Sequence, residues 1–272
     1  MRHGMRITIT LLLAAAVLPG RALAQQAATL KLSWDHCAGD GLVADRSFAC
    51  NVNVGTDVLV ASLTLDDGVE RADVNGFEFY ADFKLTTSSL PDWWRVNTGS
   101  CRANALGVGF GPFAASEHCA PWYDVDVTGP PLTGLQVEEG DDGPNGLGVR
   151  GYAALEPGVA VTLPPGQELV LFRIVINHSK STGTGSCTGC EVPACVGFGL
   201  LRLVRTDNSY EVFVGTDASA VTWQGAYVAG YAPVPPHQEG SGFVTYHGNL
   251  SCSTGSVPVQ GRTWGLIKTM YR

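Results

Sequence analysis

Charged residues are few in this chain. Asp, Glu, Lys and Arg make up 15% of the 272 residues, and the 25 acidic side chains outnumber the 17 basic ones. The formal net charge of −8 is opposite in sign to the charge with which proteins attract nucleic acid or anionic lipid. We therefore expect no nucleic-acid partner.

Long apolar runs and helical periodicity are also lacking. After an apolar stretch near the N-terminus, no segment approaches the ~18 uninterrupted apolar residues that a membrane helix needs. No stretch of about ten residues keeps a helical period with capping residues, which argues against folds with crossover helices. The six histidines are scattered, without the spacing of paired metal ligands.

The N-terminus has the pattern of a secretory signal peptide. Arg2 and Arg6 precede an apolar run over residues 7–18, and the small-residue triplet Ala22-Leu23-Ala24 follows. This pattern predicts cleavage after Ala24, so that residues 1–24 are removed. The formal charge then changes from −8 to −11, because three arginines and no acid are lost. We expect a secreted protein, extracellular or at the cell surface.

All eight cysteines lie beyond the predicted cleavage site. They are Cys37, Cys50, Cys101, Cys119, Cys187, Cys190, Cys195 and Cys252. Because thiols pair in an oxidising compartment, we predict four disulfides. Short sequence separation favours Cys37 with Cys50 and Cys101 with Cys119, which leaves the other four to make two more. Those four could instead supply tetrahedral sulfur ligands to zinc, but oxidation favours the disulfides.

Glycine and proline are abundant, with 34 and 15 residues, which is typical of many short strands joined by tight turns. Strand-like runs occupy residues 29–34, 48–54, 58–65, 76–85, 149–155, 159–163, 168–177, 196–204, 210–214 and 220–224. Phe77, Phe79, Ala81 and Phe83 alternate with polar residues, as in a half-buried antiparallel strand. Residues 99–148 have little strand signal and predict a surface excursion. The whole pattern predicts an all-β, disulfide-stapled antiparallel β-sandwich over residues 25–231.

The composition changes after residue 231. Residues 232–262 are rich in proline and glycine and predict a linker, and residues 263–272 form a short C-terminal tail. The tail carries an apolar stripe with basic neighbours: Trp264, Ile267 and Tyr271, flanked by Lys268 and Arg272. Two interpretations remain open, a sorting or attachment signal and a terminal strand or turn docked on the domain.

Two aromatic pairs are candidate ligand-binding residues. Trp93-Trp94 and Trp122-Tyr123 could stack on sugar rings or on the side chains of a partner. Adjacent residues of an extended segment point to opposite faces, so we expect either Trp93 or Trp94 to be exposed. Packing in the core is the alternative.

An acidic, glycine-rich loop is a candidate calcium site. Its oxygen-bearing side chains are Glu138, Glu139, Asp141, Asp142 and Asn145. Ca²⁺ takes six to eight oxygen ligands from such loops. The loop lacks the alternating Asp spacing of known calcium loops, so a solvated acidic turn is the alternative. No other cofactor is expected.

Two sets of motifs carry resemblances to known families. Trp34-Asp-His-Cys37, Phe48-Ala-Cys-Asn51 and the closing Thr263-Trp-Gly with Lys268 and Tyr271-Arg272 resemble a group of exported bacterial proteins without known activity. That resemblance covers most of the mature chain and implies a bacterial source. The strand pattern of residues 74–82, 148–152 and 164–176 is similar to cohesin-like and carbohydrate-binding-module jelly rolls. Those folds bind protein partners or polysaccharide and do no chemistry.

Three functions follow as hypotheses. The leading one is an exported, non-catalytic structural, adhesive or protein-binding module at the cell surface. The first alternative, a carbohydrate-binding module, requires three coplanar exposed aromatic rings on one sheet face. The second, a secreted hydrolase, requires two carboxylates or a Ser/His pair converging in a cleft. No catalytic motif is present, so we expect no enzyme. The oligomeric state is left open.

Overall fold

A computed structural model describes residues 28–111, 113–141, 143–215, 220–224, 237–239 and 243–245. Within these ranges the regular structure is almost entirely β, which confirms the predicted class. The described helices are one four-residue α-helix, α1 (Val125–Thr128), and two 3-10 turns, η1 (Ala38–Asp40) and η2 (Asp92–Trp94).

The smaller of the two main sheets has five strands. β1 (Ala28–Trp34), β3 (Thr56–Leu65), β10 (Glu168–Asn177) and β5 (Leu106–Gly109) follow one another in that order, and β6 (Cys119–Pro121) also pairs with β10. All pairs are antiparallel except β6 with β10. β10 is therefore the central strand, as its nearly continuous apolar sequence predicts.

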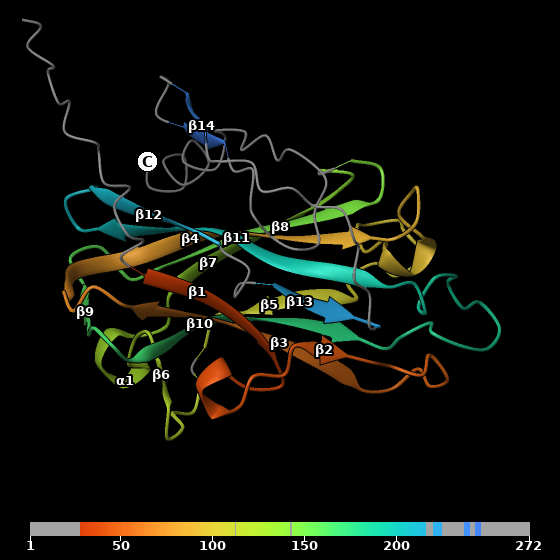
Figure 1. Cartoon of the computed structure of the whole chain (residues 1–272), viewed down its shortest axis with the longest axis horizontal. Coiled ribbons are helices and arrows are strands. Elements are labelled where there is room, and N and C mark those ends of the chain that lie inside the picture. The colour runs from red at the N-terminus through yellow and green to blue at the C-terminus, as the bar shows by residue number, and fades with distance from the viewer. Residues whose placement is uncertain are drawn as a thin grey trace, which may run out of the picture.

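The larger sheet has eight strands (Figure 1). Its order is β2 (Asp45–Arg46), β13 (Ala220–Trp223), β11 (Ala194–Arg205), β4 (Arg71–Leu85), β8 (Gly146–Ala154) and β7 (Leu132–Glu139), with β12 (Tyr210–Val214) beside β11 and β9 (Val161–Leu163) beside β4. Only β13 and β2 run parallel. A separate antiparallel pair, β14 (His237–Glu239) with β15 (Phe243–Thr245), falls in the segment predicted as a linker.

The two sheets bury one hydrophobic core between them. Phe77, Phe79, Ala81 and Phe83 of β4 all face this core, as their alternation predicts. The polar residues between them, Glu78, Asp82 and Lys84, are also buried, so β4 is covered on both faces and is not the half-buried strand that the pattern predicts. Phe79 stacks on Phe172 of β10 with ring centroids 3.7 Å apart, which joins the larger sheet to the smaller one. Burying one such side chain contributes about 1.5–3 kcal/mol.

The disulfides differ from the predicted pairs. The bridges are Cys37–Cys119, Cys50–Cys190 and Cys101–Cys187, so the expected pairs Cys37–Cys50 and Cys101–Cys119 are wrong. Each bridge closes a loop of 82 to 140 residues, because the sheets place cysteines side by side that are remote in sequence. Cys195 is also disulfide-bonded, and Cys252 lies outside the described residues.

Two predicted segments have a different structure. Residues 48–54 form an irregular loop and not a strand. Cys50, at φ 56°, takes a left-handed conformation outside the extended region, and its sulfur is bonded to that of Cys190. Residues 99–148 contain β5, β6 and β7, all of which pair with the two sheets. That segment is a structural part of the sandwich and not a surface excursion.

The predicted terminal features lie outside the described residues. This holds for the signal peptide over residues 1–24 and for the tail residues Trp264, Ile267, Lys268, Tyr271 and Arg272. Among the described residues, no helix has the length and apolar character that crossing a membrane requires.

Candidate functional site

A groove of about 570 Å³ lies at one end of the sandwich. One wall is formed by β6 and the first turn of α1, and the other by β9 and the turn that leads into β10; Figure 1 shows α1, β6 and β9 at the same end of the molecule. The lining residues are Phe113, Ala120, Pro121, Trp122, Tyr123, Asp124, Val125, Val161, Thr162, Pro164, Gln167 and Leu169.

The first wall is held in place by covalent and hydrogen bonds. The Cys37–Cys119 disulfide ties the start of β6 to the loop after β1. β6 pairs with β10, and the Trp122 amide donates to the carbonyl of Val170 at 3.2 Å. The wall is therefore preformed, which lowers the entropic cost of binding a ligand.

The groove presents polar and apolar surface in similar shares, and its polar side chains include those of Asp124, Thr162 and Gln167. The Asp124 carboxylate caps α1 by accepting a hydrogen bond from the Asp126 amide at 3.0 Å. Burial raises the pKa of Tyr123, so its hydroxyl stays protonated. Gly111, at φ +122°, leaves room for this hydroxyl, which would lie 2.8 Å from a Cβ at that position.

The second aromatic pair belongs to this groove, but its rings are largely covered. Trp122 and Tyr123 are only 3% and 4% exposed. Trp122 packs edge-on against Phe77 with centroids 5.1 Å apart. Its indole N–H is buried and has no hydrogen-bond partner among the described residues. Both residues therefore shape the groove and offer little open ring face.

The first aromatic pair lies in the core. Trp93 and Trp94 are 0% and 1% exposed, so the expectation that one of them faces solvent is wrong. The segment is the 3-10 turn η2 and not an extended strand, and both rings turn inward onto Trp223. The rule of opposite faces holds only for extended backbone.

The acidic loop uses its side chains within the protein. Both carboxylate oxygens of Asp141 accept from Nη2 of Arg150, at 2.9 and 2.7 Å, and a carboxylate oxygen of Glu138 lies 3.4 Å from the same nitrogen. Burial raises the pKa of Glu138, and its hydrogen bond to Asp141 raises it further. Glu139 instead accepts hydrogen bonds from the Asn97 amide and the hydroxyl of Ser100.

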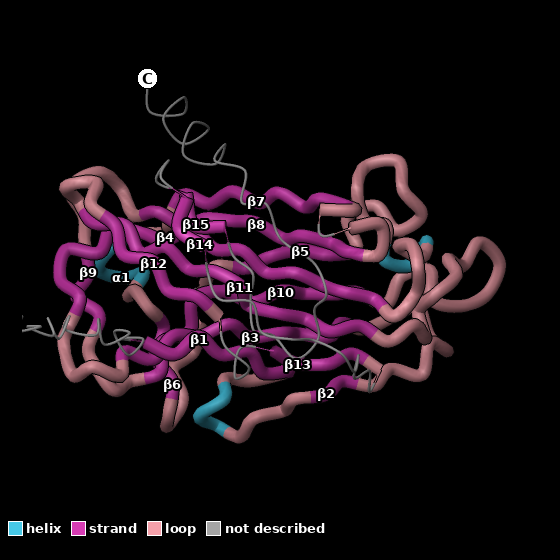
Figure 2. The backbone as a smooth tube through the Cα atoms, turned by 45° about the horizontal axis from the view of Figure 1, so that its top comes forward, coloured by secondary structure: helices cyan, strands magenta, loops and turns pink. Residues whose placement is uncertain are grey.

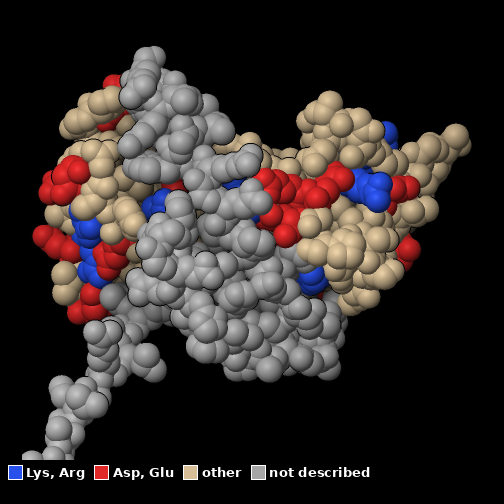
Figure 3. Space-filling model, turned by 90° about the horizontal axis from the view of Figure 1, so that it is seen from above, with Lys and Arg blue, Asp and Glu red and all other residues tan. Residues whose placement is uncertain are grey.

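The remaining calcium candidates are also apart from this pair. The side-chain amide of Asn145 donates to the backbone carbonyl of Leu85 at 2.6 Å, and Asp142 lies outside the described residues. The structure thus brings Glu138 and Asp141 together around Arg150, while Glu139 and Asn145 serve neighbouring loops. Figure 3 shows a band of acidic side chains with basic ones beside it on one side of the molecule. Calcium binding stays a prediction.

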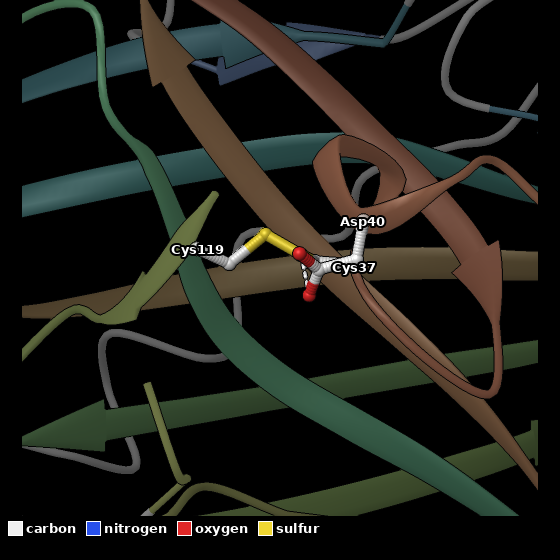
Figure 4. A group of neighbouring side chains, drawn as sticks. All are labelled: Cys37, Asp40 and Cys119. Atoms are coloured by element: carbon white, nitrogen blue, oxygen red, sulfur yellow. Dashed lines mark hydrogen bonds between the residues drawn. A yellow bond between two sulfur atoms is a disulfide. The ribbon is translucent and has the colours of Figure 1, made fainter. Parts of the chain in front are cut away.

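Another group of potential ligand atoms lies beside a disulfide (Figure 4). A carboxylate oxygen of Asp40 is 3.3 Å from the sulfur of Cys37, which is bonded to Cys119. Because metal ligation by cysteine requires a thiolate, these two sulfurs are not metal ligands in the oxidised protein. A hydrogen bond from Ser116 lowers the pKa of Asp40. The group fastens η1 to the loop before β6.

A buried histidine is held on three sides. The ring nitrogens of His178 lie 3.1 Å from the carbonyl of Val54 and 2.8 Å from a carboxylate oxygen of Asp57. Phe48 stacks on the ring at 3.7 Å, and Arg46 occupies the other oxygen of Asp57. These contacts fix the loop over residues 46–54 and leave no ring nitrogen for proton transfer with a substrate.

Part of the groove could not be predicted from the sequence. Phe113, Val161, Pro164 and Gln167 carry no motif and come from segments about fifty residues apart. The turn signal of Pro164-Pro165 was the one local sign that this region bends. Only the pairing of β9 with β4 and of β6 with β10 brings these side chains to one groove.

The fold is an antiparallel β-sandwich with jelly-roll-like layering. No protein-family model matches the chain, and no curated protein matches it. A cohesin module from a Clostridium perfringens family 33 glycoside hydrolase is similar in structure at 9% identity and a TM-score of 0.34, covering 73% of this chain and 98% of that one.

Two further solved structures are similar at the same level. A type II cohesin module from the ScaA scaffoldin of Acetivibrio cellulolyticus matches at 9% identity and a TM-score of 0.34, covering 68% of this chain and 89% of the module. Carbohydrate-binding module CBM3b from cellobiohydrolase 9A of Clostridium thermocellum, as a mutant, matches at 8% and 0.28, covering 70% and 97%. At these scores nothing about the ligands of those modules is carried over to this chain. The assignment of the fold depends on the strand pairing of this chain alone.

Proposed function

We propose that this chain is an exported, non-catalytic module that binds a protein partner by taking an apolar side chain into the groove between β6 and β9. The observation that carries the proposal is the lining: a preformed groove in which apolar side chains lie beside a few fixed polar groups can take an apolar anchor and orient it. Asp124 at its rim favours a donor or a positive charge next to the apolar anchor of the partner.

The buried titratable groups support binding over catalysis. His178 and Asp57 bond to each other, to backbone and to Arg46, away from the groove. Asp124 is the one carboxylate among the residues that line the groove, whereas hydrolysis by paired carboxylates needs two. The groove therefore offers contacts and no pair of reacting groups.

The exposed surface supports a protein ligand over a polysaccharide. Among the described residues, the large exposed hydrophobic side chains are seven aliphatic ones and a single aromatic, Tyr210. A flat polysaccharide surface is bound by several open ring faces in one plane, and the covered rings of Trp122 and Tyr123 do not provide them. Export is supported by the disulfides, which persist in oxidising compartments.

Selection from a library of displayed random peptides tests the proposal. The oxidised mature chain is the bait, and the selected peptides are expected to share an apolar residue followed by a basic one. Thr162→Arg places a long side chain in the groove from an exposed position and should weaken peptide binding by about tenfold or more. Thr86→Arg, at an exposed position just beyond the end of β4 that is opposite to the end paired with β9, is the matched control.

Binding to insoluble cellulose, chitin and xylan is measured alongside. Peptides that bind Thr162→Arg as tightly as the unmodified chain would show that the groove is not the binding site. Strong retention on a polysaccharide, unchanged by Thr162→Arg, would replace the proposal with the carbohydrate-binding alternative.

A further inference from the structure

β7 is an edge strand that lacks the usual protection among the described residues. It pairs with β8 on one side, and no described strand pairs with its other side; Figure 2 shows it along the border of the sheet. Edges are normally blocked by lysine, proline, a bulge or a covering segment. The eight residues of β7 include no proline or basic residue, and their register with β8 runs without a shift.

Hydrogen bonds at the ends of the strands show which backbone groups face outward. The Gly140 amide donates to the carbonyl of Gly146 at 2.8 Å, which continues the β7–β8 register. Residues bonded to a neighbouring antiparallel strand alternate with residues that face away. The even-numbered residues of β7 are therefore bonded to β8, and the odd-numbered residues Thr133, Leu135, Val137 and Glu139 present their amides and carbonyls to the open side.

The other side of β8 confirms this assignment. The Leu85 amide donates to the carbonyl of Asn145 at 3.1 Å, and the Leu155 amide donates to Asn75 at 2.7 Å. The odd-numbered residues of β8 are therefore bonded to β4, which leaves its even-numbered residues for β7. No backbone hydrogen bond involves the outward groups of β7 among the described residues.

We infer that β7 pairs with β7 of a second copy of this chain, antiparallel and about a two-fold axis at Gln136. In this register Thr133 lies opposite the partner's Glu139, and Leu135 lies opposite the partner's Val137. All four outward residues on each strand are then paired, with two hydrogen bonds for each of the four pairs and eight in all. The two larger sheets become one continuous sheet.

The side chains are complementary in the same register. Leu135, 43% exposed in the single chain, packs against the partner's Val137, and the symmetric contact repeats this. Gln136 lies opposite its own copy, and the side chain of Glu138 lies beside the partner's Gly134. Like charges are therefore never directly opposite, although the strand ends in two acids.

Neighbouring registers of the two β7 strands would form fewer backbone hydrogen bonds. Centring the pair on Leu135 would place Glu139 opposite the partner's Pro131, which has no amide hydrogen to donate. Centring it on Val137 would place Thr133 beyond the end of the partner's strand. The composition of the strand thus favours the register centred on Gln136, in which β7 is complementary to its own copy.

Oligomeric state in solution is the first test. The full oxidised chain is measured by analytical ultracentrifugation over a concentration series, and dimers are expected. Leu135→Lys introduces a charge at the edge and should weaken dimerisation by about tenfold or more. Leu42→Lys, the same substitution at a site that is 60% exposed and away from β7, should leave it unchanged. Because each copy is acidic, added salt should strengthen the dimer.

A cysteine cross-link tests the register without relying on Leu135. Residues at a two-fold axis between hydrogen-bonded pairs have Cα atoms about 4.5 Å apart, within the range that a disulfide spans. Gln136→Cys should give a covalent dimer after mild oxidation, and Thr133→Cys, opposite the partner's Glu139, should not.

A chain that stays monomeric at every concentration and salt level would overturn the inference, as would equal cross-linking by the two cysteine variants. A monomer whose β7 amides gain exchange protection only when a different strand-forming protein is added would assign the edge to that other occupant. Thr162→Arg should not affect dimerisation, so failure of the groove proposal and failure of this one are distinguishable.

Discussion

Arg102 is a buried cation that we expect to be essential for stability. Its side chain is 2% exposed and donates to the backbone carbonyls of Trp93, Asn177 and Ser179, at 2.8 Å for Trp93 and 2.9 Å for Ser179. The guanidinium also lies 3.4 Å from the centre of the Trp93 ring. Burial lowers the pKa of Arg102 to about 9, so the group remains charged at neutral pH.

The cost of Arg102→Ala follows from opposing effects. Each hydrogen bond from a charged donor contributes about 1.5–3 kcal/mol, and the three carbonyl oxygens lose their donor together. Relief of the buried charge offsets several kcal/mol of this. The net loss in the free energy of unfolding is therefore about 3–5 kcal/mol. Arg102→Met fills much of the volume but supplies no donors, so it should still cost about 2–3 kcal/mol.

Urea unfolding of the oxidised proteins, followed by circular dichroism, measures the effect. Arg95→Ala is the matched control, because Arg95 lies in the same loop, is exposed, and makes a 3.9 Å ion pair with Asp92 and one hydrogen bond, at 3.3 Å, to the carbonyl of Leu90. Its loss should cost about 1 kcal/mol or less. If Arg102→Ala unfolds within about 1 kcal/mol of the unmodified chain, the reasoning is wrong. A fully stable Arg102→Met would show that packing, and not hydrogen bonding, is what Arg102 supplies.

Three further predictions concern stability and disulfides. Burial raises the pKa of the Glu78 carboxyl group, so the folded state binds its proton more tightly and loses stability as the pH rises past the unfolded pKa of about 4.3. Glu78→Gln should therefore be more stable than the unmodified chain at pH 7 and equally stable below pH ~4.3. An unchanged dependence of stability on pH would contradict this. Gly76→Ala should cost about 2 kcal/mol or more, because its Cβ would lie 2.4 Å from a backbone oxygen, whereas Gly109→Ala, which meets nothing within 4 Å, should be neutral in thermal unfolding. Peptide mapping without reduction should recover Cys195 joined to Cys252, the one cysteine left by count; a free thiol at either would refute it.

Much of the sandwich could be predicted from local pattern. The alternation of Phe77, Phe79 and Phe83 predicts which face of β4 joins the core between the sheets, although not that the other face is covered too, and the apolar run of β10 marks a central strand. The prediction for residues 99–148 was wrong because β5 and β6 are only four and three residues long, and because β7, eight residues long, has no buried residue and no regular alternation of apolar and polar residues. Such strands gain their stability from the neighbours they pair with, so their own sequence carries little signal.

The candidate site was only half predictable. Trp122 and Tyr123 were recognised by residue type, and they do line the groove. The opposite wall has no motif, since Val161 and Gln167 become groove residues only through the pairing of strands remote in sequence. Trp93 and Trp94 show the converse: the same residue types enter the core because a single 3-10 turn changes where their side chains point.

The sequence by itself determined the class of fold and the oxidised state of its cysteines. The alternation of apolar and polar residues and the number of cysteines can be read along the chain without knowing which segments contact one another. Only the tertiary structure decided which cysteines pair, which aromatic rings are covered and which backbone edge stays open. Those outcomes depend on the order of strands in each sheet. That order is set by the packing of residues tens to more than a hundred positions apart, which no single segment encodes.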